Sequence, residues 1–405
     1  ENVPNLRFPE FSGEWEKTKL GKIGETFNGL TGKSGSDFGQ GSPYITYKSI
    51  FDNSRIDLSR VEYVTITDAE RKKQTQNEVQ YGDIFFTTSS ETPDEVGMTS
   101  VLLDEVKDCY LNSFCFGYRL NSITDVLPEY MRFYLRSNTI RRRLFVLAQG
   151  STRFNISKGE VMGLTIKLPG TAEQRKIAQL LTMIEDRIAT QIKIIEDLKK
   201  LKSAISKRVF AQKDLLETTI CLSDIATLKN GYAFQSSKYN PLGKWKILTI
   251  ANVSGERYIN NEDCNCIINL PSDIQNHQVL KEGDILISLT GNVGRVSLCK
   301  AGDYLLNQRV GLLQFTNNAN REFIYQVLSS RRFENSMIAC GQGAAQMNIG
   351  KGDVENYVLP YSTNANNIHL VAKILQSYDE KIINEQRRLS LLTIQKQYLL
   401  SQMFI

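Results

Sequence analysis

Two long stretches of the chain carry hydrophobic residues at alternating steps of four and three, the spacing of a helical seam. The first runs from Thr171 to Gln212, follows Pro169-Gly170 and contains neither proline nor glycine. With Thr171 as a candidate N-cap, it predicts one helix of roughly 60 Å at 1.5 Å per residue. Polar Gln191 and Lys202 interrupt the seam. Its apolar members are Ile177, Leu181, Ile184, Ile188, Ile195, Leu198, Ile205 and Val209.

The second stretch, Asn366 to Phe404, repeats this pattern and supplies a partner for the first. A shift of 194 residues superimposes the two seams together with their interruptions, so that Glu385 falls on Gln191 and Lys396 on Lys202. Because matching interruptions are rare by chance, we interpret the pair as one duplicated helix; the alternative is two unrelated amphipathic helices. The apolar members of the second seam are Val371, Leu375, Tyr378, Ile382, Leu389, Leu392, Leu399 and Met403.

The segment before the first helix has short alternating runs separated by turns, which predict strands. Examples are Tyr44–Tyr47, Val61–Val64 and Asp83–Thr87, and a helical patch follows at Pro128–Val146. The segment therefore predicts an α+β domain. Residues 1–14, which are polar and contain two prolines, predict an arm that lies on this domain.

The segment before the second helix repeats the same order of motifs. Leu20–Ile23 with Asn28-Gly29 recurs as Leu222–Ile225 with Asn230-Gly231; Gly82-Asp83-Ile84 recurs as Gly283-Asp284-Ile285; Leu111-Asn112 recurs as Leu306-Asn307; Asn155-Ile156 recurs as Asn348-Ile349. The spacing and the loops between these motifs differ, which indicates a common scaffold with divergent loops. The predicted division is an arm (1–14), a globular domain (15–168), a helix (169–212), a second globular domain (213–361) and a second helix (362–405).

Composition limits the partners and the kinds of site that can be expected. The chain has 405 residues, a net charge of +5 and a pI near 8.7, which permits a polyanionic partner without requiring one. Seven irregularly spaced cysteines predict reduced thiols in the cytoplasm, and two distant histidines give no zinc pattern, so we expect neither metal nor cofactor. We find no membrane span or signal peptide in the sequence. Numbering from Glu1 leaves the true N-terminus open.

The ordered double occurrence of these motifs resembles the specificity subunit of Type I restriction-modification systems. The resemblance covers essentially the whole chain, and the entry of the second helix departs from it, since Asn366–His369 replaces an acidic-Gln-Arg-Lys pattern. It is carried by Trp15 with Leu20–Ile23, the two Gly-Asp-Ile strands, Gly291–Arg295, Gly150–Ile156, Gly343–Ile349, and Leu168-Pro169 leading into Glu173–Ala178.

The resemblance implies an α+β fold of two repeated target-recognition domains, each followed by a long helix. The two helices are implied to pack as an antiparallel coiled coil with pseudo-twofold symmetry. Each domain would read one half of a split sequence in double-stranded DNA. The helices would bind two DNA-adenine methyltransferase subunits and, through them, motor-nuclease subunits. Chemistry would belong to those partners, so the chain itself is expected to be non-catalytic, without a cofactor, and cytoplasmic.

Candidate DNA-binding residues follow from the chemistry of bases and phosphates. Arg, Asn, Gln, Ser and Thr side chains can hydrogen-bond base edges. Those in suitable loops are Thr88, Ser89, Arg153, Asn155, Thr290, Asn292, Arg295, Gln346 and Asn348. Basic residues that could neutralise phosphates are Lys33, Lys48, Lys158, Lys238, Arg309 and Lys351. Alternatively, asparagine beside glycine makes turns, and surface lysine is common. Tyr47 and Phe154 are expected to pack in the protein and not to stack on bases.

Two alternative functions stay open at this point. Asp94, Glu105 and Lys107 have the acid, acid-x-lysine order of a metal-dependent nuclease, although the second half lacks it. A helical scaffold that binds proteins and no DNA is the other. Binding of a random duplex that weakens steeply with salt would exclude the scaffold.

Two further catalytic motifs fail on spacing. Gly29–Ser34 ends like a phosphate-binding loop but has two residues between its glycines where four are required. Asn240–Gly243 is only a partial echo of the Asn/Asp-Pro-Pro-Tyr/Phe motif of adenine methyltransferases. We therefore predict neither nucleotide binding nor methyl transfer by this chain.

Overall fold

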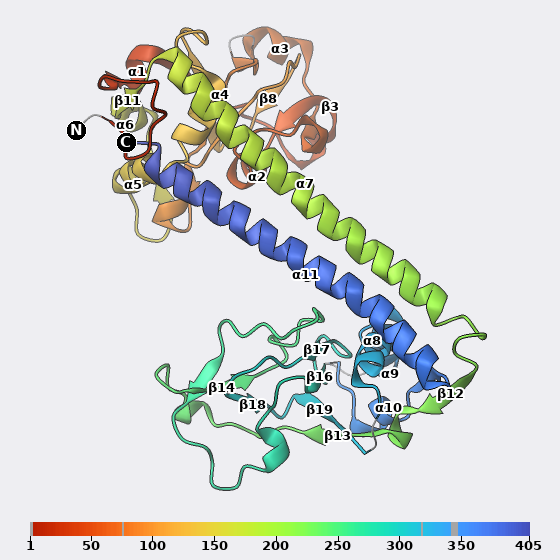
Figure 1. The fold of residues 1–405 in the computed structure, drawn as a ribbon. Helices are drawn as coiled ribbons and strands as arrows, with labels where there is room; N and C mark the ends of the chain where they lie inside the picture. The colour runs from red at the N-terminus through yellow and green to blue at the C-terminus, as the bar shows by residue number, and fades with distance from the viewer. Residues whose placement is uncertain (1–2, 75–76, 317–318, 342–346) are drawn as a thin grey trace. The chain divides into compact units, whose positions relative to one another are not determined.

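The computed structural model describes residues 3–74, 77–316, 319–341 and 347–405 (Figure 1). Contacts divide the chain into two compact units: unit 1 is Glu1–Gln191 with Leu389–Ile405, and unit 2 is Ile192–Arg388. The two predicted helices are confirmed as α7 (Thr171–Val209) and α11 (Ala365–Gln402). Each unit thus contains one globular lobe, part of α7 and part of α11. The linear domain boundaries expected above stay a prediction.

The lobe of unit 1 is built on small sheets. An antiparallel sheet has the order β2-β9-β5-β7, with β2 Gly24–Asn28, β9 Cys115–Leu120, β5 Ile84–Thr87 and β7 Thr99–Val101. A second sheet has the order β4-β3-β8, with β4 Glu62–Val64, β3 Phe38–Ile45 and β8 Tyr110–Leu111. β1 (Glu16–Lys19) pairs with β11 (Thr165–Leu168), which leads into α7, and β6 (Ser89–Ser90) pairs with β10 (Phe154–Asn155).

The lobe of unit 2 repeats this topology. Its four-stranded sheet has the order β13-β19-β16-β17, with β13 Ala226–Asn230, β19 Val310–Phe315, β16 Ile285–Ser288 and β17 Val296–Leu298. The next has the order β15-β14-β18, with β15 Asn265–Ile267, β14 Trp245–Leu248 and β18 Tyr304–Leu306. β12 (Thr218–Cys221) pairs with β20 (Val358–Tyr361), which precedes α11. Equal strand orders in both lobes confirm the duplication.

Short helices cover the sheets. In unit 1 they are α1 Leu20–Ile23, α2 Tyr47–Asp52, α3 Asp68–Gln74, α4 Pro128–Tyr134, α5 Asn138–Leu147 and α6 Lys158–Gly163. In unit 2 they are α8 Arg321–Leu328, α9 Arg331–Cys340 and α10 Lys351–Glu355.

Two local sequence predictions need correction, and N-caps explain both. The helical patch expected at Pro128–Val146 is two helices, because the Ser137 side chain accepts a hydrogen bond from the Ile140 amide and begins α5. The strand expected at Tyr44–Tyr47 ends at Ile45, because Thr46 caps α2 in the same way.

The Gly-Asp-Ile motifs are turns that lead into β5 and β16. Gly82 and Gly283 have φ values of +86° and +80°, a conformation that favours glycine. The following carboxylates accept a hydrogen bond across the turn, Asp83 from the Gln80 amide and Asp284 from the Lys281 amide, each at 2.8 Å. Burial raises the pKa of both carboxyl groups. The motif therefore serves the scaffold.

The N-terminal arm, the end of α11 and the residues that follow it close unit 1. Phe404 is 3% exposed, and its ring centroid lies 5.7 Å from those of Tyr130 and Tyr134. The Leu6 amide donates to the Gln402 carbonyl at 3.0 Å. Arg7 forms an ion pair with Glu173 of α7 at 2.7 Å. The arm thus lies on the two long helices of its unit.

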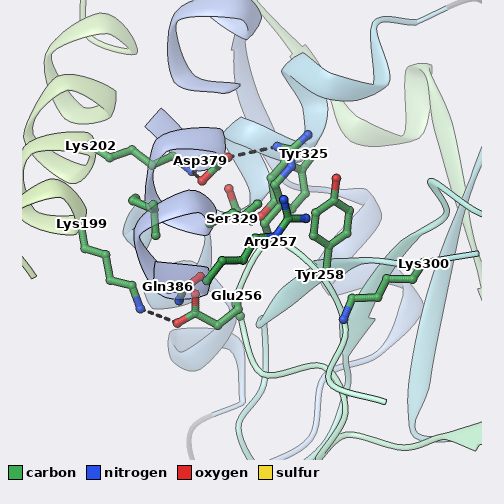
Figure 2. A pocket seen from close by; sticks show the side chains of 14 residues that line it. Lys199, Lys202, Glu256, Arg257, Tyr258, Lys300, Tyr325, Ser329, Asp379 and Gln386 are labelled. Atoms are coloured by element: carbon green, nitrogen blue, oxygen red, sulfur yellow. Dashed lines mark hydrogen bonds and ion pairs between the residues drawn. The ribbon is translucent and has the colours of Figure 1, made fainter. Parts of the chain in front are cut away.

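An acid joins the lobe to both long helices in each unit; Asp379 is buried, and Glu185 is partly buried. In unit 1, Glu185 of α7 binds Lys396 of α11 at 2.6 Å and Arg132 of α4. In unit 2, Asp379 of α11 binds Lys202 of α7 at 2.6 Å and Arg257 of the lobe at 3.1 Å (Figure 2). The two acids, like the two lysines, are related by the 194-residue shift.

These acids explain the lysines that interrupt the seams, because each lysine pairs with an acid on the other helix. In unit 2 the pair borders a cavity of about 430 Å³ between lobe and helices, in which Figure 2 also shows Tyr325 and Ser329. Burial lowers the pKa of Arg257, but its hydrogen bonds to Glu322 and the nearby acids raise it above the ordinary value. Within unit 2 the lobe is held on the helices by this network.

Candidate nucleic-acid interface

Three loops of unit 1 meet where β5 ends and β9 begins. We call residues 88–90, 112–115 and 153–156 loop cluster 1. The amide and hydroxyl of Thr88 donate to the Phe114 carbonyl at 3.2 and 2.7 Å. The Ile156 amide donates to the Thr88 carbonyl at 3.0 Å, and Ser89 pairs with Asn155. Backbone hydrogen bonds therefore hold the three loops in one arrangement.

Unit 2 repeats the arrangement in residues 289–291, 307–310 and 347–349, which we call loop cluster 2. The Leu289 amide donates to the Arg309 carbonyl at 3.0 Å, and the Ile349 amide donates to the Leu289 carbonyl at 2.9 Å. Thr290 forms a bridge with Asn348. Loop clusters 1 and 2 thus share their backbone contacts and differ in side chains.

The glycine of the repeated Asn-Gly motif packs against one loop of each cluster. A Cβ atom on Gly29 would lie 2.0 Å from the Asn112 carbonyl oxygen, and one on Gly231 would lie 2.2 Å from that of Asn307. The chain can pass there only because these positions have no side chain. In the Gly29–Ser34 motif, Gly29 thus allows close packing, and Gly32 has a positive φ of 79°.

The structure brings most candidates of the first half together. Thr88, Ser89, Arg153 and Asn155 lie in loop cluster 1, where Arg153 and Asn155 are exposed. Ser89 is buried, so its side chain does not offer the base contact that its residue type suggested. Lys158 follows in α6; its Nζ donates to Asn28 and lies 5.9 Å from the Phe116 ring centroid. Burial lowers the pKa of Lys158.

Two lysine candidates of the first half differ in their surroundings. Lys48 is exposed on α2, next to Tyr47, whose hydroxyl donates to the Ser89 carbonyl at 2.7 Å. Lys33 lies apart from loop cluster 1, since its side chain is 7% exposed and pairs with Glu70 at 2.7 Å. Of these two lysines, Lys48 therefore offers the accessible charge beside the cluster.

In the second half, Thr290, Arg309 and Asn348 lie in loop cluster 2, and Asn292 is exposed in the adjoining turn. Lys351 is exposed at the start of α10, three residues after Asn348. Two other candidates lie outside the cluster, and Gln346 lies outside the described residues. Arg295 faces Glu334 of α9 at 3.8 Å, and Lys238 is exposed in the turn at Ser236–Lys238.

Sequence reasoning missed Phe114, which is 62% exposed in loop cluster 1. Its amide donates to Asn112 Oδ1 at 2.7 Å, as the Arg309 amide donates to Asn307 Oδ1 at 3.2 Å. The repeated Leu-Asn motif could have found it, because Phe114 stands two residues after Asn112 as Arg309 stands two after Asn307. Tyr47 and Phe154 pack against core residues, as expected.

The exposed side chains of the clusters offer amide and guanidinium groups, which hydrogen-bond base edges, whereas the Ser89 side chain and the Thr290 hydroxyl are buried. Among the described residues, no group of three or more His, Cys, Asp and Glu could hold a metal ion. No helix in the described part of the chain is long and apolar enough to cross a membrane.

Comparison with known proteins decides the family. The sequence matches the "Type I restriction modification DNA specificity domain" twice, over residues 12–200 and 217–393. The chain belongs to this type I specificity family. It is 24% identical over 402 residues to the type I restriction enzyme MjaX specificity subunit of Methanocaldococcus jannaschii. The alignment covers 94% of this chain and 91% of that one. Over 242 residues it is 26% identical to the MjaVIII specificity subunit of the same organism, covering 54% and 55%.

Solved structures show the same fold for this type I specificity subunit. The type I S subunit from M. genitalium aligns over 100% of this chain and 99% of its own, with a TM-score of 0.59 and 17% identity. A structure from a study of complex assembly and conformational transition of the type I system aligns over 95% and 96%, with a TM-score of 0.57 and 16% identity. The resemblance seen in the sequence is confirmed, and no finding supports the nuclease alternative.

Proposed function

We propose that loop clusters 1 and 2 are the surfaces with which this specificity subunit reads DNA, one half of a split target each. The observation that carries the proposal is a conserved backbone arrangement under different side chains in the two lobes. Asn155 and Asn348 occupy matched positions, whereas exposed Phe114 is matched by exposed Arg309. Such a scaffold supports two readers with different base preferences.

Basic side chains around each cluster are proposed to bind phosphates. Lys48, Lys158 and Arg153 lie in or beside loop cluster 1, and Lys351 lies close in sequence to loop cluster 2. Phosphate contacts fix the position of a protein on the duplex and make its affinity depend on salt.

The long helices are proposed to bind two DNA-adenine methyltransferase subunits and, through them, the restriction subunits. Both units expose large apolar side chains on their helical parts, a feature typical of protein-binding surfaces. These are Met183, Leu391, Ile394 and Tyr398 in unit 1, and Ile192, Ile194, Leu201, Leu370 and Ile374 in unit 2. Methylation and cleavage are then partner activities, and the proposed role of this chain is recognition in the cytoplasm without catalysis.

A lobe exchange tests the division of labour. Replacing residues 213–361 by the matching lobe of a related subunit should change one half of the methylated sequence and leave the other half unchanged. The reciprocal exchange of residues 15–168 serves as the matched control and should change the opposite half. Methylome sequencing of cells that carry each chimera with the methyltransferase partner reads the result. If either exchange changed both halves, the lobes would not read DNA independently.

A further inference from the structure

Phe114 is exposed although the phenylalanines around it are buried. Its side chain is 62% exposed, whereas Phe85, Phe86 and Phe116 in the adjoining strands are fully buried. Single exposed apolar side chains are common, so it is the place of Phe114 in the proposed DNA surface that makes it a candidate contact.

A loose backbone does not explain the exposure of Phe114. The Phe114 amide donates to Asn112 Oδ1 at 2.7 Å, and its carbonyl accepts two hydrogen bonds from Thr88. The next amide, of Cys115, donates to the Asn112 carbonyl at 3.1 Å. The backbone on both sides of the ring is therefore fixed, and the ring points away from the core on a rigid support.

The matched position in unit 2 carries Arg309. Strand registers establish the match, because Cys115 pairs with Thr87 in the first sheet and Val310 pairs with Ser288 in the second. Arg309 is exposed and has the same backbone bonds, from its amide to Asn307 and from the Leu289 amide to its carbonyl. The two positions share these backbone bonds and differ in the side chain that they carry, and the bond from the Thr88 hydroxyl has no counterpart at Leu289.

Phenylalanine and arginine suit different bases. Arginine hydrogen-bonds the O6 and N7 atoms of guanine, whereas phenylalanine makes apolar contact with the 5-methyl group of thymine. The major groove distinguishes all four base pairs, and the polar neighbours Asn155 and Asn348 suit the same groove. We propose that this matched position reads one base in each half-site, with Phe114 on a thymine methyl group and Arg309 on a guanine. The inference rests on the proposed DNA surface.

Deoxyuridine, which is thymine without its methyl group, tests the Phe114 contact. The probe is the subunit in complex with its methyltransferase partner, on duplexes in which each thymine of the first half-site is replaced in turn. We expect one replacement to weaken binding by about fourfold, the effect of one buried methyl group. In the F114A complex that replacement should have no effect, and in F114L it should again weaken binding.

Arg309 is tested on the second half-site in the same way. R309A should lose the preference for guanine at one position by tenfold or more, and R309K should recover only part of it because lysine makes no planar bidentate contact. The first half-site should be unchanged in both variants. Thermal unfolding of all four variants verifies that they fold.

Other outcomes would overturn the inference. Equal sensitivity to deoxyuridine in the original and F114A complexes would exclude the methyl contact. A Phe114-dependent rise in 2-aminopurine fluorescence would mean that the ring unstacks bases as a minor-groove wedge. N155A separates this inference from the proposed surface: if F114A keeps the full specificity while N155A relaxes the first half-site, only the inference fails. If neither variant changes specificity, both fail.

Discussion

At the scale of single residues, the accessibility of a charge decides whether it can bind a phosphate. Lys48 is exposed on α2 beside loop cluster 1, whereas Lys33 is 7% exposed and paired with Glu70. Both lysines met the sequence criterion equally well. Their environments now separate them.

We predict that Lys48→Ala weakens binding to all sequences and reduces the slope of log affinity against log salt by about one unit, because one phosphate contact is lost. Lys33→Ala is the matched control and should leave the slope unchanged. Titrations of specific and random duplexes at several salt concentrations measure both. An equal reduction of the slope by the two variants would contradict the assignment.

The residue scale also shows where sequence reasoning stops. Asn155 and Asn348 could be chosen because a repeated motif marks them, and the structure brings both into loop clusters. Phe114 could not be chosen by residue type, because most phenylalanines are buried and composition does not report exposure. Arg295 met the composition rule, yet its side chain faces Glu334 in α9, a contact between residues distant in sequence.

At the scale of elements, an acid at matched positions next to the two seams ties each lobe to its helices. Arg257 contacts two acids, Asp379 and Glu322, which raise its pKa. Arg132 contacts Glu185. Burial outweighs this contact, so the pKa of Arg132 is lowered. The joint of unit 2 is therefore the better compensated one.

We predict that Asp379→Asn destabilises unit 2 by about 3 kcal/mol, the lower end of the range for breaking a buried ion pair. The lower end applies because Arg257 still forms its ion pair with Glu322 in this variant. In addition, the Lys202 side chain is 17% exposed, so water can reach the charge that loses its partner. Asp197→Asn on α7 removes an exposed i,i+3 pair with Lys200 and should change stability by less than about 1 kcal/mol.

The two tryptophans allow this measurement. Trp15 lies in unit 1 and Trp245 in unit 2, so a Trp15→Phe background lets fluorescence during urea unfolding report on unit 2. If Asp379→Asn and Asp197→Asn had equal effects on that transition, the buried pair would not stabilise the joint.

The periodicity of the seams predicted both helices to within a few residues and marked Lys202 and Lys396 as exceptions. It could not name their partners, because the heptad spacing does not say which residue faces which across two helices. Glu185 and Asp379 look like ordinary surface acids in the sequence, and only the packing shows that Asp379 is buried and Glu185 partly buried.

At the scale of the whole molecule, unit 1 combines segments from both ends of the chain. Phe404 belongs to the same core as residues of the first lobe and of α7. Sequence patterns predicted the duplication, since each strand and loop is local. The antiparallel packing implied by the resemblance placed the end of the second helix beside the start of the first. It did not predict that Phe404 enters the core of the first lobe, because that contact spans the chain.

We predict that Phe404→Ala destabilises unit 1 by about 3 to 5 kcal/mol, the usual cost of removing a buried phenylalanine. Trp15 fluorescence in a Trp245→Phe background reports on unit 1. The transition of unit 2, read from Trp245, should not move. Tyr398→Ala near the end of α11 is the control and should have little effect, because Tyr398 is 57% exposed. A shift of both transitions by Phe404→Ala would show that the units unfold together.

The grouping of residues in unit 1 imposes an order on synthesis. Unit 2 is one continuous stretch, so all its residues have left the ribosome's catalytic centre before residues 389–405 are made. Unit 1 receives Phe404 and the partner of the Leu6 amide only after that. The first lobe, although translated first, is thus the last to be completed. A truncated mRNA that ends anywhere in the second half yields a chain whose first lobe lacks part of its core.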